Sequence, residues 1–329
     1  MKISYDIGVV STRLEPSYCR DLAVDVEKAG FDVAWMGDHF LPWYHSGAHC
    51  PHAWVWMASA LERTNKIPIG SDVTVPMFKY HPAVVAQAYA TMASMYPGRV
   101  ILGVGTGEAI NEAPFIPSWP KWNARAKILV EALDLIRKYW NSDTYFGYDG
   151  KYIQVKGEIF CYDKPKQYVP VYWSAFGPQS SILAGKYADH LMTSVSPQKC
   201  RDTIFPNFDR GARSVGKDPA TMDKCVFIET GYGDKKTLVQ NYRNTLAGGL
   251  IPENNDEKDP RKIEALGRKL DDEYILARSY FISNADECFK IITRYEQVGT
   301  THVIIGDYST DPRKTVEFFS EEIIPQLKS

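Results

Sequence analysis

The sequence predicts an α/β fold, namely a single-domain (β/α)8 TIM barrel that covers residues 1–329. Short apolar segments alternate with amphipathic helical segments, and eight of the apolar segments have the length of strands. These strands are apolar on both faces, which is typical of parallel strands covered by helices. A doubly wound sheet is the competing arrangement, but no GxGxxG motif follows the first strand. We therefore expect a closed barrel.

The first part of the chain repeats strand and helix without interruption. Strands are expected at residues 2–10, 31–37, 67–75 and 99–107, and helices at 18–30, 53–64 and 82–98. Gly30 is a suitable end for the first helix, because glycine readily adopts the left-handed C-cap conformation. Pro82 opens the third helix, and Pro97 with Gly98 ends it.

The alternation continues after two predicted insertions. The first follows strand four: after a helix at 124–140, residues 145–160 form an excursion in which Asp149 and Gly150 predict a hairpin turn. The later strands are expected at 168–176, 189–194, 224–233 and 301–308, and helices at 177–188, 198–215 and 313–329. The second insertion, residues 248–286, lies between strands seven and eight and is helical at 263–282. A connection of this length is usually functional or disordered.

Composition excludes several classes of function. The formal net charge is −2 and the pI is near 6.4, which gives no reason to expect nucleic acid or an anionic membrane as partner. No apolar run approaches the ~18 residues that span a bilayer, and the N-terminus does not resemble a signal peptide. The six cysteines form no CxxC pair, which argues against a zinc ribbon. We expect a soluble cytoplasmic protein.

Candidate functional residues lie where the predicted strands end, because the active sites of (β/α)8 barrels lie at the C-terminal ends of the strands. These ends carry Asp38, His39, Asp72, Thr74, Thr106, Gly107, Glu108, Asn111, Ser174, Gly177, Thr193, Ser194, Glu229 and Thr230. His39 has the residue type of a general base near neutral pH, and Glu108 could orient it or transfer a second proton. A solvated His and Glu at strand ends is the alternative.

Two further patterns near these ends allow more than one interpretation. The glycines of GVGTGEAIN could let a ligand approach the backbone or could serve chain geometry alone. His39, His45, His49, Cys50 and His52 could form a metal site, but Gly47 and Pro51 disfavour a regular helix there, so we expect no metal and a loop at the pocket mouth. Trp43 follows a proline in this loop and could form a wall against a planar ligand.

Three segments carry a resemblance to a known family. DHFLPWYH, HPAVVAQAYATMASMYPGRVILGVGTGEAINE and VPVYWSAFGP are similar to coenzyme F420-dependent dehydrogenases of the luciferase-like superfamily. The resemblance runs from residue 1 to about 245 and resumes at about 278. It implies a (β/α)8 barrel, usually a homodimer, with the deazaflavin at the C-terminal mouth as a hydride carrier.

The resemblance assigns roles to individual residues. His39 matches the base that takes the hydroxyl proton, Glu108 a carboxyl with a proton-transfer role, and Trp43 a residue that contacts substrate and reduced ring. Cofactor contacts are implied for Asp38, Asp72, Val73, Val75, Thr106, Gly107, Asn111, Phe176, Gly177, Gln179 and Ser180. A non-prolyl cis peptide behind the ring is implied for the bond between Asp72 and Val73.

Substrate contacts are expected from Thr193, Ser194, Glu229, Leu246 and Arg278. Sugar-phosphate members of the family use three cationic side chains, and the matching positions here are Pro197, Asn254 and Arg278, of which only the last is cationic. Alcohol dehydrogenase members have aromatic residues where this chain has Glu229 and Leu246. A polyol, an unphosphorylated sugar or another alcohol would suit this more polar pocket.

The leading hypothesis is therefore an F420-dependent dehydrogenase of a secondary alcohol or sugar hydroxyl. A sugar-6-phosphate dehydrogenase is the first alternative. A pterin one-carbon reductase, a flavin monooxygenase and a barrel that binds F420 without catalysis are further alternatives.

Overall fold

Eight parallel strands close into a barrel in the computed structural model, which describes residues 1–251 and 256–328. The barrel strands, in spatial order, are β1 (Lys2–Asp6), β2 (Ala34–Met36), β3 (Ile69–Ser71), β4 (Val100–Val104), β7 (Val171–Ser174), β8 (His190–Thr193), β9 (Lys224–Tyr232) and β11 (His302–Asp307). Pairing of β9 with β8 and of β11 with β1 closes the ring. The predicted (β/α)8 fold is confirmed, and its single-domain organisation stays a prediction.

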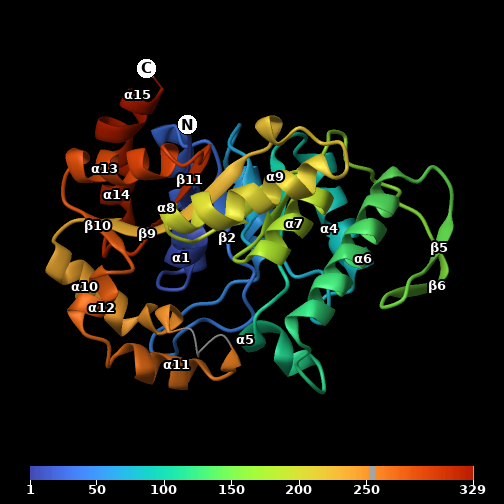
Figure 1. The fold of residues 1–329 in the computed structure, drawn as a ribbon, viewed down its shortest axis with the longest axis horizontal. Coiled ribbons are helices and arrows are strands. Elements are labelled where there is room, and N and C mark those ends of the chain that lie inside the picture. The colour runs from blue at the N-terminus through green and yellow to red at the C-terminus, as the bar shows by residue number, and fades with distance from the viewer. Residues whose placement is uncertain (252–255, 329) are drawn as a thin grey trace.

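Helices surround the barrel (Figure 1). They are α2 (Pro16–Ala29), α3 (Ala53–Arg63), α4 (Pro82–Met95), α6 (Trp122–Asn141), α7 (Pro178–Tyr187), α8 (Pro197–Lys199), α9 (Phe205–Arg213), α10 (Lys235–Asn244), α13 (Ala285–Glu296), α14 (Pro312–Phe318) and α15 (Ile324–Leu327). Gly30 ends α2 with φ 90°, as its position predicts. None of the helices in the described ranges is long and apolar enough to cross a membrane.

The first strand is shorter than predicted. It ends at Asp6, and α1 (Ile7–Ser11) begins directly after it, so the strand prediction for residues 7–10 is wrong. The Asp6 carboxylate accepts a hydrogen bond from the Val9 amide at 3.2 Å and so caps the helix. The apolar residues that follow Asp6 are buried by this short helix instead of by a strand. Asp6 therefore lies at a strand end.

The two insertions have distinct structures. The hairpin after α6 pairs β5 (Phe146–Asp149) with β6 (Gln154–Ile159) and projects from the barrel side, as Figure 1 shows. In the second insertion α11 (Pro260–Gly267) and α12 (Asp272–Leu276) are helical, but residues 280–282 form β10 (Tyr280–Ile282), where a helix was predicted. This strand pairs in parallel with the end of β9, because β9 extends past the barrel wall. Asn254 lies outside the described residues.

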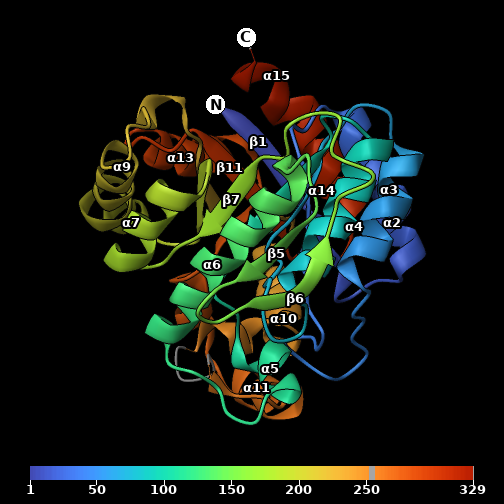
Figure 2. The same ribbon diagram turned by 90° about the vertical axis from the view of Figure 1, so that its right-hand side faces the viewer.

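One end of the barrel gathers the elements that surround the functional site. The short helix α5 (Ala109–Glu112) and the helices α10 and α11 lie at the end opposite both chain termini (Figures 1 and 2). This is the end at which the parallel strands finish. Inside the barrel, a small apolar cluster that includes Trp35, Tyr172 and Ile304 fills the interior below it. The C-terminal strand ends therefore lie above a packed apolar interior.

Candidate active site

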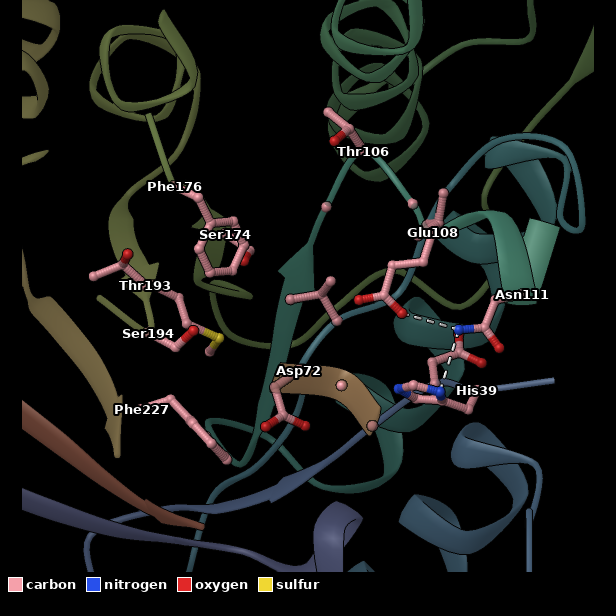
Figure 3. Close-up of a pocket in the computed structure, with 18 of the residues that line it drawn as sticks. His39, Asp72, Thr106, Glu108, Asn111, Ser174, Phe176, Thr193, Ser194 and Phe227 are labelled. Carbon is pink, nitrogen blue, oxygen red and sulfur yellow. Dashed lines mark hydrogen bonds between the residues drawn. The ribbon is translucent and has the colours of Figure 1, made fainter. Parts of the chain in front are cut away.

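A cavity of about 910 Å³ opens at the C-terminal ends of the strands. Figure 3 shows Phe176 and Phe227 on one side of it, and His39 and Glu108 on the other. This volume lies within the ~300–1,000 Å³ usual for small-molecule and cofactor sites. The site is therefore large enough for an extended planar ligand together with a small substrate.

His39 follows β2 and is held by Asn111 from the short helix α5. The Asn111 Oδ1 accepts hydrogen bonds from the amides of Phe40 (2.8 Å) and Leu41 (3.2 Å), which fixes the amide so that Nδ2 faces His39 Nδ1 at 3.2 Å. The Leu41 carbonyl lies 3.4 Å from the same Nδ1. The other ring nitrogen, Nε2, turns away from Asn111 toward the cavity (Figure 3). It is therefore positioned to exchange a proton with a ligand.

Glu108 belongs to the same hydrogen-bonded group. Its Oε2 accepts a hydrogen bond from Asn111 Nδ2 at 3.3 Å, so one amide links the carboxylate and the imidazole. The side chain is open to the cavity, but protein surrounds it closely enough for burial to raise the pKa of Glu108, against the opposing effects of His39 and the Asn111 hydrogen bond. The Trp43 ring lies edge-on to His39, with 6.4 Å between ring centroids. The three side chains with predicted catalytic roles thus meet at one wall.

Asp38 lines the same wall, but its carboxylate is engaged inside the protein. It forms an ion pair with Lys79 at 3.1 Å, and both side chains are almost fully buried. Thr74 and Tyr80 donate two further hydrogen bonds to the carboxylate. Such a buried, fully paired carboxylate anchors the loop after β2. A ligand would therefore contact Asp38 through its backbone and not through its carboxylate.

The backbone after β3 forms the floor of the cavity. The bond between Asp72 and Val73 is a cis peptide, which confirms the prediction made from the resemblance. A Cβ added at Gly103 would come within 1.9 Å of the Ser71 carbonyl oxygen, and one at Gly105 would come within 2.6 Å of the Val73 side chain. Close approach of the two chain segments therefore explains these two glycines, in keeping with the chain-geometry interpretation.

A pair of acidic residues, Asp6 and Asp72, lies in this floor. Burial raises the pKa of Asp72 well above its usual range, and the charge of Asp6 adds to the rise. Burial also raises the pKa of Asp6 to about 7. The Asp72 Oδ1 atom is buried without a hydrogen-bond partner among the described residues. The floor thus holds a carboxyl group whose pKa is raised by burial and whose Oδ1 has no hydrogen-bond partner among the described residues.

Another acidic group of the lining is Glu229 of β9. The hydroxyl of Tyr242 donates a hydrogen bond to Glu229 Oε2. Burial raises the pKa of Glu229 to about 7, and the Tyr242 hydrogen bond only partly opposes this. Leu246 and Tyr308 line the cavity beside them. This wall combines one carboxyl with phenol groups.

The start of α7 provides backbone amides suited to an anion. Gly177 is the N-cap, and Ser180 exchanges hydrogen bonds with its backbone at 3.1 and 3.0 Å. Helix N-termini favour negative groups because several amides there lack partners in the helix. Arg125 also lines the cavity and donates to the Thr106 carbonyl at 3.0 Å. By contrast, the amide of Glu108 at the start of α5 is already bound by the Glu112 carboxylate at 2.8 Å, so α5 offers no comparable site.

Comparison with known proteins identifies the family. Residues 3–302 match the model of the luciferase-like monooxygenases. The chain belongs to the luciferase-like monooxygenase family. It is 34% identical to an F420-dependent glucose-6-phosphate dehydrogenase of Microbacterium testaceum, over 97% of this chain and 95% of that protein. It is 35% identical to a Nocardia farcinica protein of the same name, over 94% of this chain and 93% of that protein.

Solved structures show the same relationship. An F420-dependent secondary alcohol dehydrogenase in complex with an F420-acetone adduct matches with a TM-score of 0.93 and 36% identity, over 100% of this chain and 99% of that one. A coenzyme F420-dependent tetrahydromethanopterin reductase from Methanopyrus kandleri matches with a TM-score of 0.76 and 19% identity, over 99% of both chains. The second likeness shows the fold alone.

In this luciferase-like chain, one predicted site residue lies apart from the others. The residues that line the cavity are Asp38, His39, Trp43, Asp72, Val73, Val75, Thr106, Gly107, Glu108, Asn111, Phe176, Gly177, Gln179, Ser180, Thr193, Ser194, Glu229 and Leu246. Arg278 does not line it: its side chain is exposed, and the guanidinium stacks on the Tyr274 ring at 3.6 Å. The structure therefore leaves Arg278 outside the cavity, because α12 and its own aromatic neighbour hold it at the surface.

The metal-site alternative receives no support from the geometry. His45 is exposed, the Tyr80 hydroxyl lies 3.3 Å from His52 Nε2, and the Cys50 thiol contacts the His39 carbonyl at 3.5 Å. Across residues 1–251 and 256–328, no group of three or more His, Cys, Asp or Glu side chains is arranged to hold a metal ion. This loop forms part of the cavity rim instead.

Several lining residues were missed by the sequence interpretation. They are Asp6, Glu112, Arg125, Phe227, Tyr242 and Tyr308. Asp6 would have been found if the end of the first strand had been placed correctly. Glu112 and Arg125 belong to helices, and Tyr242 to α10, so no strand-end signal marks them.

Proposed function

We propose that the chain is a coenzyme F420-dependent dehydrogenase that transfers a hydride between the deazaflavin C5 and the carbinol carbon of a secondary alcohol or sugar. The observation that carries this is the position of His39 Nε2, which faces the cavity beside Glu108 and Trp43. The curated relatives and the neighbouring structure named above are F420-dependent dehydrogenases, which supports the same cofactor here.

The residues of the cavity fit such a cofactor. Three buried polar atoms in its lining have no hydrogen-bond partner among the described residues: Asp72 Oδ1, Glu112 Oε1 and Thr193 Oγ1. Unpaired buried polar atoms are rare, so atoms of this kind in a cavity wall indicate a polar ligand. A flat, polar ring system can occupy this space, with its anionic tail at the start of α7.

The chain's own residues account for the proton transfer. Coenzyme F420, when bound, supplies the hydride acceptor. His39 takes the hydroxyl proton at Nε2, as the hydride leaves the carbon, in the tautomer whose Nδ1–H donates to the Leu41 carbonyl; in this tautomer Nδ1 does not accept a hydrogen bond from Asn111 Nδ2. The negative charge of Glu108 stabilises the resulting imidazolium by electrostatic attraction. In the opposite direction His39 returns the proton to the carbonyl oxygen.

The sugar-6-phosphate alternative is supported by the names of the curated relatives. Its predicted phosphate contact, Arg278, lies at the surface outside the cavity lining. Pterin reduction, flavin-dependent oxygenation and cofactor binding without turnover remain alternatives that the same assay distinguishes.

The assay follows bleaching of oxidised F420 near 420 nm with isopropanol, glucose, glucose-6-phosphate and several polyols. We expect reduction with at least one hydroxyl substrate and about 10²–10⁴-fold slower turnover in His39→Ala, as for loss of a general base. His45→Ala is the matched control, because His45 is exposed and does not line the cavity. Reduction of FMN in place of F420, or full activity of His39→Ala, would contradict the proposal.

We also propose a homodimer and a cytoplasmic location. Val84, Tyr145 and Tyr162 are exposed apolar side chains that line a groove of about 480 Å³ between α4 and the β5–β6 hairpin. An exposed apolar surface of this kind suits contact with a second copy. Light scattering of the wild-type chain and of Val84→Glu tests it: the dimer should dissociate in the variant.

A further inference from the structure

We propose that Glu229, together with the phenol groups of Tyr242 and Tyr308, binds a second hydroxyl group of the substrate, so that the substrate is a neutral polyhydroxy compound instead of a simple alcohol or a sugar phosphate. This inference rests on the proposed dehydrogenase function. It adds the class of molecule that the same cavity selects.

The strand register places Glu229 at a defined level of the barrel mouth. Glu229 pairs with Gly306 of β11, and Gly306 pairs with Asp6 of β1, so the two acidic residues flank a glycine at one level. Gly306 has no side chain to cover them, and the space where its Cβ would lie is occupied by the Phe227 ring. The Glu229 carboxyl is therefore presented to the cavity above Phe227.

The hydrogen-bonding capacity of Glu229 is only partly used. Among the described residues its hydrogen-bond partner is Tyr242, which donates to Oε2. No lysine or arginine of the described chain forms an ion pair with it. The side chain is half-buried and lines the cavity, so the second carboxyl oxygen has access to a ligand. A carboxyl group held in this way accepts a hydrogen bond from a hydroxyl that enters the cavity.

The neighbours of this wall place it close to the reacting centre. Tyr242, Leu246 and Tyr308 belong to one apolar cluster, against which Trp43 packs. Trp43 in turn lies edge-on to His39. A substrate whose carbinol meets His39 therefore extends along Trp43 toward the phenol groups and Glu229. A hydroxyl near the reacting carbon falls within this region.

The described lining of the cavity holds no available cation for a phosphorylated substrate. Apart from Asp38, which is paired with Lys79, the acidic residues of the lining are Asp6, Asp72, Glu108, Glu112, Glu229 and Asp256. Among the described lining residues, Arg125 is the one with a lysine or arginine side chain. Its guanidinium donates hydrogen bonds to the carbonyls of Thr106 and Pro120 and stacks on the Trp119 ring, 4.2 Å from the ring centroid. A sugar phosphate would bring a dianion to the Glu229 wall without a cation to pair with it. A neutral polyol brings only hydroxyl groups.

Protonation of Glu229 does not remove the subsite. Its pKa lies at about 7 because of burial, so the carboxyl is present in both forms near neutral pH. The charged form accepts a hydrogen bond from a substrate hydroxyl, and the neutral form can also donate one. A hydroxyl group is both donor and acceptor and satisfies either form.

The test compares substrates that differ in one group. F420 reduction is measured with 2-butanol against 2,3-butanediol, and with glucose against glucose-6-phosphate. For the wild type we expect kcat/KM to be at least tenfold higher for the diol than for the monoalcohol, since a site built to bind a hydroxyl discriminates against the analogue that lacks it. The wild-type kcat/KM should also be higher for glucose than for glucose-6-phosphate.

Variants of Glu229 then link the preference to the carboxyl. Glu229→Leu should lower the diol-to-monoalcohol ratio at least tenfold, and Glu229→Gln should lower it less, because the amide still forms a neutral hydrogen bond. Both variants should raise kcat/KM for glucose-6-phosphate relative to kcat/KM for glucose. Glu62→Gln is the control: it alters a glutamate–tyrosine hydrogen bond (2.7 Å, with Tyr96) that lies outside the cavity, and its ratios should equal those of the wild type. Thermal unfolding checks that each variant is folded.

Each result has a distinct meaning. Equal kcat/KM for diol and monoalcohol in the wild type, or an unchanged ratio in a folded Glu229→Leu, overturns the subsite while the dehydrogenase function stands. A wild-type preference for glucose-6-phosphate over glucose overturns the neutral substrate class. Absence of F420 reduction with all four compounds and with isopropanol overturns the proposed function and this inference with it.

Discussion

Replacement of Glu112 by Gln should remove a pH-dependent loss of stability. Glu112 is 1% exposed, and its Oε1 is buried without a hydrogen-bond partner among the described residues, while Oε2 accepts from the Glu108 amide at 2.8 Å. Burial raises the pKa of Glu112 from 4.5 to about 8, helped by the charge of Glu108 and opposed by Lys79. Glutamine has nearly the same shape and retains an oxygen for the amide.

The pKa shift determines the sign and size of the effect. The folded protein holds the Glu112 proton up to about pH 8, whereas the unfolded chain releases it near pH 4.5. Between these values the folded state binds more protons, so the free energy of unfolding falls as pH rises, by up to ~1.4 kcal/mol per pH unit for this one group. The stabilising contribution is complete below pH 4.5 and lost by about pH 8. From pH 5 to pH 7.5 the loss is on the order of 3 kcal/mol.

Thermal unfolding of the wild type and Glu112→Gln at several values from pH 5 to pH 8 measures this. The melting temperatures should be similar at pH 5, and the variant should melt higher by several degrees near pH 7.5, at roughly 2 °C per kcal/mol for a chain of this size. The carboxyls of Asp6, Asp72 and Glu229, whose pKa values are also raised, affect both proteins equally. A difference in melting temperature that stays constant from pH 5 to pH 8 would refute the reasoning.

Three further variants test individual contacts. Lys79→Met should lower the free energy of unfolding by about 3–5 kcal/mol, because it leaves the Asp38 carboxylate buried without its cation. Chemical denaturation measures this free energy, and a decrease below about 1 kcal/mol would contradict the prediction. Asn111→Ala should lower kcat more than it raises KM, because the amide that positions His39 is lost, and should raise the pKa of Glu108 in the pH–rate profile, because the hydrogen bond that lowers it is lost; an unchanged profile would argue for a purely structural amide. Gly103→Ala should destabilise by at least ~1–3 kcal/mol through overpacking, because the added Cβ would lie 1.9 Å from a backbone oxygen, and wild-type stability in denaturant would exclude that clash.

The sequence was sufficient for features that depend on periodic patterns. The order of strands and helices, the Gly30 cap and the strand ends at His39 and Glu108 all follow from spacing and turn chemistry. The first strand was predicted too long because residues 7–10 are apolar, and apolarity alone does not separate a buried strand from a short buried helix. That error concealed Asp6, which a correct strand end would have added to the candidate site.

Other features depend on tertiary contacts that no local pattern encodes. Arg278 was expected near the substrate from the resemblance to the family, but its position is determined by α12 and by stacking on Tyr274. The residues 280–282 were predicted helical and form a strand, because the end of β9 offers an unpaired edge. Tyr242 lies on α10, the helix that follows β9, and its hydroxyl reaches Glu229 by the way this helix packs over the end of the strand.

The extension of β9 beyond the barrel connects the insertion to a different part of the cavity from the one that holds His39 and Glu108. Thr230, directly after Glu229, pairs with Asp307 on one side and with Tyr280 of β10 on the other. The insertion is therefore hydrogen-bonded to the strand that carries Glu229, whereas His39 and Glu108 follow β2 and β4. With Glu229 in the proposed substrate-binding role and His39 in the proposed proton-transfer role, changes in the insertion would alter substrate selection without displacing His39. A library confined to the residues after β9 would diversify specificity without rebuilding the chemistry.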